Sequence, residues 1–362
     1  MLNNANEGHS RDELMSYYKE VVEEASKLLA TNDIDWKGKF KEYLEKPDFS
    51  GHENYWFQAY DKIIKKAEKK TGAYFYFTTQ GSASLRFNGS IIIDSLCTAR
   101  ARGRQVKGTI DKQSGYDLED NKTVEIMKEK VQYFADKEKT RSDNQLESFY
   151  ESGILKTMNE DNKQGKDTFY RHIKPIKRLN NGLTGNKKRE IGLFQMATPF
   201  KASEFKSNPQ KLEYAGASDG GGIDILARRG KTRWDSILTL IEVKNEYNRE
   251  SEPPEITMGQ LIAYAVFLCN LIEEDSINWG HAFGYMSKDG YRKKELNLIV
   301  MLPVPNDGKL PREDFLSETK DGINLSVSAL NEEKYIFHLG YAYFDPSNFM
   351  EVKYSSLESL DR

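Results

Sequence analysis

The chain has 362 residues, of which 38% are hydrophobic, 12% aromatic and 30% charged, and its formal net charge is −3. This length suits two domains, or one large domain with an insertion, and the hydrophobic content is sufficient for a core. The near-neutral charge balance gives no global signature of nucleic-acid binding, although a basic groove can still exist locally.

Features that report on compartment indicate a cytoplasmic protein with no membrane partner. No stretch approaches the run of about 18 apolar residues that a membrane helix needs, and the polar N-terminus lacks the apolar segment of a signal peptide. Cys97 and Cys269 stand in apolar surroundings, which predicts buried free thiols of an intracellular protein. Two cysteines also exclude a cysteine-rich zinc site.

Two helices and three strands are predicted in the first hundred residues. Apolar residues recur at helical spacing over residues 12–30 and again over 53–70, which predicts two amphipathic helices. Strand-like segments follow at residues 73–79, 83–87 and 90–94. The dipeptide Asn88-Gly89 between the last two strands is a strong signal for a two-residue hairpin turn.

A polar stretch separates these elements from the rest of the chain. It begins with a basic cluster that suits either a nucleic-acid-binding loop or an exposed linker: Arg100, Arg102, Arg104 and Lys107. Residues 111–121 are expected to form a loop, and helices are expected over 123–137 and from Asp143 onward. We therefore expect an N-terminal α+β region over residues 1–120, a candidate recognition or interaction domain, and a second domain over 121–362.

The second domain is expected to combine several strands with one long helix. A polar segment over 159–189 carries a second basic region that includes Lys187, Lys188 and Arg189. Strands are predicted at 191–198, 222–229 and 237–244, and these would build the core sheet. A helix introduced by Pro253 and Pro254 is predicted over 256–273. Further strands are predicted at residues 280–286, 295–302 and 335–344.

Three charged residues, Asp224, Glu242 and Lys244, interrupt the otherwise apolar strands of this core. A charge inside such a strand is costly unless it is paired or binds a cation. Side chains alternate along a strand, so Glu242 and Lys244 share a face. Flanking isoleucines place Asp224 on a strand as well, and pairing of the two strands would bring Asp224 beside Glu242.

This arrangement predicts a metal site with a positioned lysine. The carboxylates of Asp224 and Glu242, together with the Val243 carbonyl, would offer the hard oxygen ligands that Mg²⁺ or Mn²⁺ prefers. A protonated Lys244 cannot bind a metal. It could orient or help deprotonate a water molecule, or neutralise charge on a transferring phosphate.

The pattern of Asp224 followed by Glu242-Val243-Lys244 resembles the PD-(D/E)XK phosphodiesterase superfamily. Gln260 and Tyr264 extend the likeness, because RecB-like members carry Gln-x-x-x-Tyr on the next helix. The resemblance implies an α/β fold with a mixed central sheet flanked by helices, a divalent metal, and hydrolysis of a nucleic-acid backbone. The proline of the family pattern is absent, since Ile223 precedes Asp224.

The same resemblance implies a further acidic ligand from a helix that precedes the core strands. The helix expected from Asp143 offers Glu147 beside its apolar stripe, and Glu151 follows one turn later on the same side. Glu147 is the candidate metal ligand and Glu151 competes with it.

The sequence therefore predicts a metal-dependent nuclease over residues 121–362 that acts on nucleic acid, with DNA favoured over RNA. The expected catalytic residues are Asp224, Glu242, Lys244, Gln260 and Tyr264, and the expected metal ligands are Asp224, Glu242, Val243 and Glu147. A homodimer would suit double-strand cutting, and roles in restriction, defence or repair stay open. The alternative is a catalytically inactive nucleic-acid-binding or assembly module on the same fold.

Overall fold

The computed structural model describes most of the chain, in the ranges 10–45, 59–79, 83–98, 105–137, 143–164, 169–170, 172–179, 190–202, 205, 208–232, 236–245, 253–285, 291, 293–304 and 323–355. Several predicted features lie outside these ranges. They are the start of the helix expected over 53–70, the basic residues Arg100, Arg102 and Arg104, and Lys187, Lys188 and Arg189 of the second basic region.

The first of the two large sheets is built mainly from the N-terminal part of the chain. Its strand order is β10-β9-β1-β2-β3-β4-β5. The strands span β1 Tyr74–Thr78, β2 Ala83–Phe87, β3 Ser90–Thr98, β4 Val106–Ile110, β5 Gln113–Asp117, β9 Leu193–Ala197 and β10 Gly222–Ile223. Strand β9 is parallel to β1 and antiparallel to β10, so this sheet crosses the boundary expected near residue 120.

The hairpin predicted at Asn88-Gly89 is confirmed. Phe87 pairs with Ser90 across a two-residue turn in which both residues have positive φ, 47° for Asn88 and 79° for Gly89, as a type I′ turn requires. The tip of the hairpin presses on helix α7, because a Cβ atom added at Gly89 would lie 2.4 Å from the Ser148 carbonyl oxygen. The prediction of a loop over 111–121 is wrong, because strand β5 lies within that range.

The second sheet carries the long strands of the C-terminal part. Its order is β14-β15-β13-β12-β11-β6, and β16 also pairs with β15. The strands span β6 Ile173–Pro175, β11 Ile225–Arg229, β12 Ile237–Val243, β13 Glu295–Pro303, β14 Ile323–Ser328, β15 Lys334–Asp345 and β16 Asn348–Ser355. Strands β12, β13 and β15 are parallel, whereas β11 is antiparallel to β12. A separate two-stranded pair joins β7 (Arg178–Leu179) and β8 (Glu190–Ile191).

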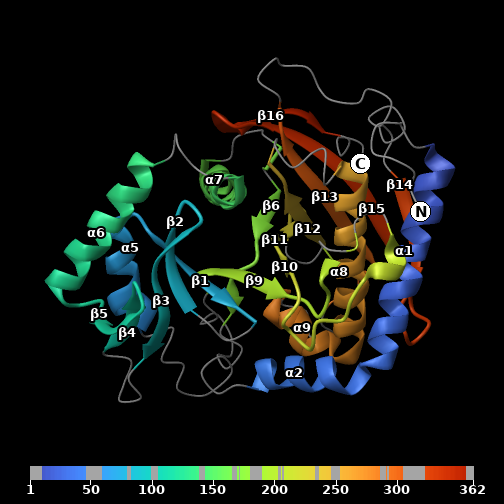
Figure 1. The fold of residues 1–362 in the computed structure, drawn as a ribbon, viewed down its shortest axis with the longest axis horizontal. Coiled ribbons are helices and arrows are strands. Elements are labelled where there is room, and N and C mark those ends of the chain that lie inside the picture. Colours follow the sequence, from blue (N-terminus) through green and yellow to red (C-terminus); the bar gives the residue numbers. More distant parts are fainter. Residues whose placement is uncertain are drawn as a thin grey trace.

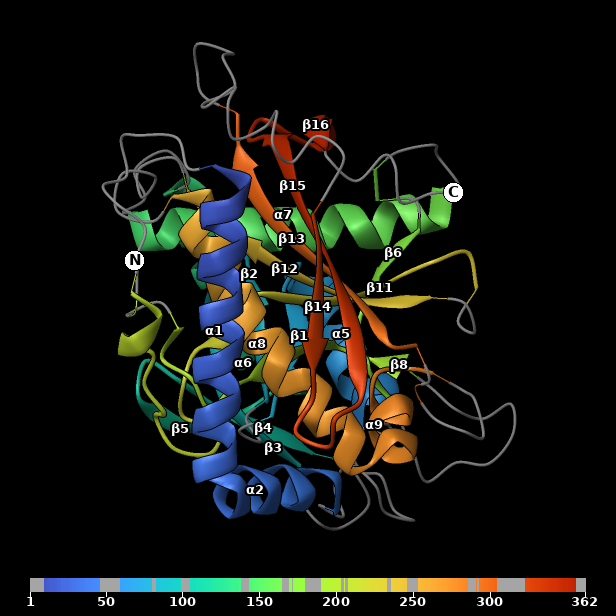
Figure 2. The same ribbon diagram turned by 90° about the vertical axis from the view of Figure 1, so that its right-hand side faces the viewer.

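Helix α8 (Pro254–Glu274) is the central element of the larger core, with the N-terminal helix α1 (Arg11–Thr31) packed along it (Figure 2). A capping box between Ser10 and Glu13 begins α1. By length and composition α8 is apolar enough to cross a membrane, so the expectation that no stretch reaches this limit is wrong. Its most apolar window is wholly buried in the protein, which is typical of a core helix.

The other helices surround the two sheets. Helices α2 (Asp33–Glu45) and α9 (Ser276–Ala282) pack near one end of α8, and the π-helical turn η1 (Tyr60–Ile64) continues into α5 (Lys65–Thr71). Helix α6 (Asn121–Asp136) packs against α5, and a 3-10 turn, η5 (Pro209–Lys211), lies near α1. The strand expected at 280–286 is wrong, because Asp275 caps α9 there.

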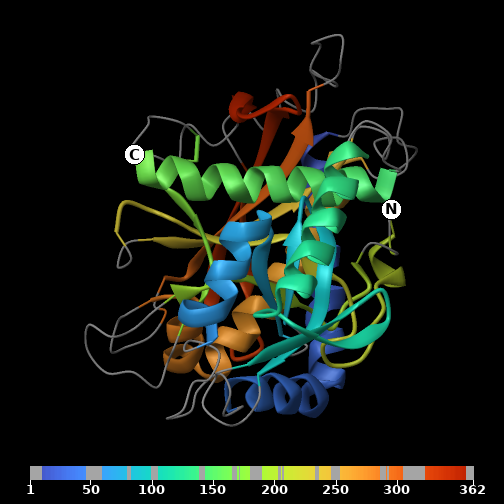
Figure 3. The same cartoon turned by 90° about the vertical axis from the view of Figure 1, so that its left-hand side faces the viewer.

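Helix α7 (Asp143–Gln164) lies between the two sheets. It is seen end-on in Figure 1, with the first sheet on the left and the second on the right, and it runs across the upper part of the molecule in Figure 3 as the long green helix. Ile154, Leu155 and Met158 from α7 share a core with Ile241 and Val243 of β12. The alternate residues of β12, Leu238 and Leu240, pack instead in the larger core that contains α8 and α1.

The fold class expected from the sequence is confirmed: a mixed α/β protein in which helices flank sheets of parallel and antiparallel strands. Helix α2 and strands β4, β6, β14 and β16 were not predicted. Cys269 is buried as expected, but Cys97 is exposed on β3, so the prediction of a buried thiol is wrong for that residue.

The contact between the β2–β3 hairpin and α7 gives a stability prediction. Gly89→Ala should lower the free energy of unfolding by about 2–4 kcal/mol, because it adds a backbone clash to the strain of a positive φ. The control is Gly115→Ala in β5, where φ is 97° but nothing lies within 4 Å of the added Cβ. That control should lose only about 1–2 kcal/mol. Equal losses in urea unfolding would show that the hairpin does not press on α7.

Candidate metal centre between the two sheets

Asp224 occupies the point at which the chain passes from one sheet to the other. Strand β10 ends at Ile223 in the first sheet, and β11 begins at Ile225 in the second. The strand expected over 222–229 is therefore interrupted, and Asp224 lies at a bend and not within a strand. The Val243 backbone N–H donates to the Asp224 Oδ2 at 2.8 Å. The β11–β12 ladder ends at the pair Ile225 and Ile241. Beyond that pair, this side-chain hydrogen bond connects the two segments.

Glu242 lies near the end of β12 and Lys244 directly follows the strand, and both residues are almost completely buried. Their exposed fractions are 4% and 6%. Alternation along the strand places both side chains on the side of Leu240, which packs in the core around α8. The predicted shared face of these two residues is consistent with the 3.1 Å distance between Lys244 Nζ and Glu242 Oε1.

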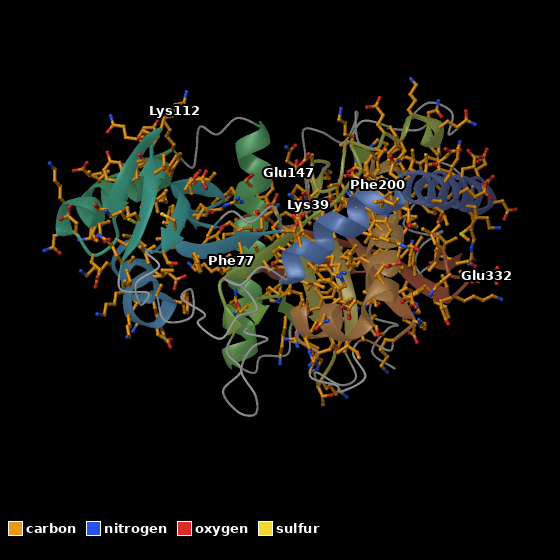
Figure 4. All side chains as sticks on the ribbon, turned by 90° about the horizontal axis from the view of Figure 1, so that it is seen from below. Lys39, Phe77, Lys112, Glu147, Phe200 and Glu332 are labelled. Carbon is orange, nitrogen blue, oxygen red and sulfur yellow. The ribbon has the colours of Figure 1, made fainter. Side chains whose placement is uncertain are left out.

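Glu147 joins this pair from α7. Lys244 Nζ donates to Glu147 Oε1 at 3.1 Å, so the ammonium group bridges two carboxylates from different elements. Oxygens of Glu147, Asp224 and Glu242 lie within 4.8 Å of one another. Figure 4 shows Glu147 on α7 near the middle of the molecule, between the teal elements of the first sheet and the orange ones of the C-terminal part. Three residues far apart in sequence thus form one acidic cluster.

Glu151 borders the cluster one turn further along α7. Burial raises its pKa to about 8, and the carboxylates of Glu147 and Glu242 add to this effect, whereas Arg86 and Lys244 oppose it. The residue is half-buried as a whole, but its carboxyl group is surrounded by protein. Both helix acids therefore contribute to the site. Glu147 belongs to the group that could share one cation, and Glu151 supplies negative charge beside it.

The same environment acts on Asp224. Burial raises the pKa of its carboxyl well above the usual value, and Glu242 and Glu151 raise it further, while Lys244 lowers it. Four carboxyl groups thus face two cationic side chains, Lys244 and Arg86, among the residues that interact here. A bound divalent cation would offset this excess of acid. The oxygen-only donor set fits Mg²⁺ or Mn²⁺ better than a softer metal.

The predicted role of Val243 stays a prediction. Its backbone N–H contacts the cluster by donating to Asp224, and binding of a metal by its carbonyl oxygen is not tested by that contact.

Gln260 and Tyr264 lie one turn apart on α8, and both are buried. The Tyr264 hydroxyl packs against Gly221, since a Cβ atom there would lie 2.2 Å from the hydroxyl oxygen. This contact brings the helix face to the chain segment that leads into Asp224. The Gln260 amide is fully buried, and neither its nitrogen nor its oxygen has a hydrogen-bond partner among the described residues.

Arg86 on β2 was not among the predicted site residues. It stacks over the Tyr76 ring at 4.3 Å and interacts electrostatically with Glu151. The signal was present in the sequence, because Arg86 is a charged residue within the strand Ala-Ser-Leu-Arg-Phe. Its distance from Glu242 in sequence gave no reason to connect the two.

Comparisons with known proteins add no relative. No protein-family model, curated protein or solved structure matches the chain. A functional proposal for this chain therefore has to be argued from its sequence, its fold and the geometry of the acidic cluster.

The raised pKa of Glu151 gives a pH prediction for the metal-free protein. Between the ordinary value of 4.5 and the value of about 8 in the folded state, the folded protein holds a proton that the unfolded chain has lost. Stability must therefore decrease as the pH rises through this window. Melting temperatures measured in EDTA from pH 5 to pH 9 should fall for the wild type and fall less steeply for Glu151→Gln.

The control for this measurement is Glu125→Gln, an exposed glutamate on α6 that should keep the wild-type slope. Mg²⁺ should reduce the difference between the wild type and Glu151→Gln, because a cation favours the deprotonated carboxylates. A Glu151→Gln profile parallel to that of the wild type would contradict the assigned environment.

Proposed function

We propose that this protein is a divalent-metal-dependent nuclease that hydrolyses phosphodiester bonds, with DNA as the first substrate to test. The observation that carries the proposal is the convergence of Glu147, Asp224, Glu242 and Lys244 from three separate elements into one cluster. The resemblance of the same residues to the PD-(D/E)XK pattern supports it. Cleavage of nucleic acid, the metal and the catalytic roles are all part of the proposal.

Each residue has a distinct task in this proposal. Glu147, Asp224 and Glu242 would hold the cation, and the Val243 N–H would orient the Asp224 carboxylate. A bound Mg²⁺ or Mn²⁺ would supply Lewis-acid polarisation of the phosphate and a lower pKa for an attacking water. Lys244, already placed between two carboxylates, would donate to that water or to a phosphate oxygen.

Gln260 and Tyr264 would act on the substrate side of the site. A buried amide without a protein partner is costly, and such a group can be retained for an interaction with a ligand. We assign Gln260 to holding either the substrate backbone or Lys244 in place. Tyr264 would hold the segment before Asp224 through its contact with Gly221.

One observation favours a catalytically inactive module as the second candidate. Lys244 bridges Glu147 and Glu242, as it would in a buried ion-pair network that has only a structural role. The two candidates differ in cleavage activity. The nuclease should cleave nucleic acid only when a divalent cation is present, whereas the inactive module should not cleave it with or without the cation. The cleavage experiment decides between them.

We expect the wild type to cleave labelled nucleic acid in Mg²⁺ or Mn²⁺ but not in EDTA. Linear, circular and single-stranded DNA, with a matched RNA, make up the substrate set. Glu242→Gln and Lys244→Met should each reduce the rate by at least about 100-fold, because the first removes a carboxylate that would hold the cation and the second removes the cationic donor to the water or the phosphate. These near-isosteric changes limit the loss of packing, and circular dichroism should confirm the fold.

Glu125→Gln and Lys128→Met form the matched control pair, since these residues make an exposed ion pair on α6. Both controls should cleave like the wild type. Cleavage at the wild-type rate by both site variants would reject the nuclease assignment, and nucleic-acid binding without cleavage would favour the inactive module.

Gln260 gives a prediction that separates stability from activity. Gln260→Met keeps the volume of the side chain and removes a buried amide that makes no hydrogen bond to the residues that the structure describes. The melting temperature should therefore stay the same or rise, while the cleavage rate falls by about tenfold or more. A variant that loses stability and keeps activity would show that Gln260 has a structural role.

A further inference from the structure

A cavity of about 310 Å³ lies beside the acidic cluster, between α7 on one side and α5, β1 and β2 on the other. Its volume is within the range of small-molecule sites in proteins. The half-buried aromatic residues Tyr60, Tyr74 and Phe87 contribute to its wall. The cavity is therefore large and apolar enough to receive a planar ring.

The cavity and the acidic cluster share α7 as a common wall. Glu151 faces the cluster, and the next residue, Ser152, lines the cavity. Tyr74 also links the two, because its hydroxyl donates to Ser152 Oγ at 2.7 Å and its ring lines the cavity. Since α-helices rise about 1.5 Å per residue, Lys156 and Asn159 lie within about 8–12 Å of Glu151 along the axis. A neighbouring nucleotide of a bound strand can reach that far.

Polar groups converge on the cavity from several elements. Asn88 comes from the hairpin tip that presses on α7, and Asn159 comes from α7 itself. The Glu68 carboxylate from α5 accepts from the Phe75 N–H at 2.8 Å and also borders the cavity. Amides and a carboxylate next to aromatic rings are the groups that bind the edge and face of a nucleobase.

The charges on the rim match a phosphate backbone. Lys156 is exposed on α7, and Lys177 lines the same cavity from the segment after β6. Lys177 interacts electrostatically with the Glu68 carboxylate, so the exposed Lys156 is the cation that suits a phosphate of a bound nucleotide. The wall also includes Tyr60, the first residue of a π-helical turn, and such turns are frequent at functional sites.

We propose that this cavity receives one unstacked base of the nucleic-acid strand whose phosphate lies at the acidic cluster. The inference rests on the proposed nuclease function and names its substrate class: single-stranded nucleic acid, or a duplex with a base that leaves the stack. A base enters between Tyr60, Tyr74 and Phe87, Asn88 and Asn159 contact its edge, and Lys156 contacts the backbone.

The cavity is tested by binding in EDTA, where no cleavage can occur. Each of the four deoxynucleoside monophosphates is titrated into the full-length protein by calorimetry. At least one should bind saturably and be displaced by a short single-stranded oligonucleotide. Tyr60→Leu and Asn88→Gly should each weaken this binding by about tenfold. Glycine is suited to the positive φ of Asn88, so the second variant removes the amide and keeps the turn.

The control variant is Tyr133→Leu, an exposed tyrosine on α6 that should bind like the wild type. Absence of saturable binding, or unchanged binding by both cavity variants, would overturn the inference. A bound mononucleotide that the single strand does not displace would also overturn it, because the cavity would then serve a free nucleotide.

Failure of the nuclease proposal has a different signature. Glu242→Gln should keep mononucleotide binding in EDTA and lose cleavage in Mg²⁺. The wild-type protein could bind a mononucleotide that the oligonucleotide displaces, and yet never cleave nucleic acid. That result would reject the nuclease proposal and keep the base-binding cavity.

Discussion

The hydrogen bond from the Val243 N–H to the Asp224 carboxylate fixes the part of the structure on which the candidate site depends. At Asp224 the chain leaves the first sheet and enters the second, so the β11–β12 ladder stops one residue short of Glu242. The end of β12 is left open on that side, and the side chain of Asp224 replaces the missing backbone acceptor. Glu147 can then approach Lys244 from α7.

This geometry carries an electrostatic cost that the protein does not remove. Burial and mutual repulsion raise the pKa values of the Asp224 and Glu151 carboxyl groups. Lys244 and Arg86 offset only part of the acid. An acidic cluster of this kind is compatible with a divalent cation, and strongly raised carboxyl pKa values are frequent at functional sites. Helix α7 connects the cluster to the aromatic cavity, because consecutive residues, Glu151 and Ser152, face the two.

Local pattern predicted most of the regular elements, and the errors have physical causes. The predicted ranges for α1, α8 and β13 are close to those observed, because each has a long, consistent apolar pattern. The polar strand β5 lacks that pattern, and pairing with β4 holds it in place. The aromatic-rich segment near Phe283 resembles a strand in composition, yet Asp275 caps a helix there and Gly284 turns the chain with φ 86°. Strand β14 shows clear alternation from Ile323 to Val327 and could have been predicted.

For the candidate site, the sequence alone determined which residues are chemically out of place: Asp224, Glu242 and Lys244, charged residues flanked by apolar ones. It also placed Glu242 and Lys244 on one face, because strand alternation is a local rule. Only the tertiary structure decided that Glu147 reaches Lys244, that Glu151 and Arg86 border the cluster, and that a cavity lies next to it. These contacts join segments far apart in the chain. These contacts depend on how the helices pack against the sheets, and a local apolar pattern in the sequence does not predict that packing.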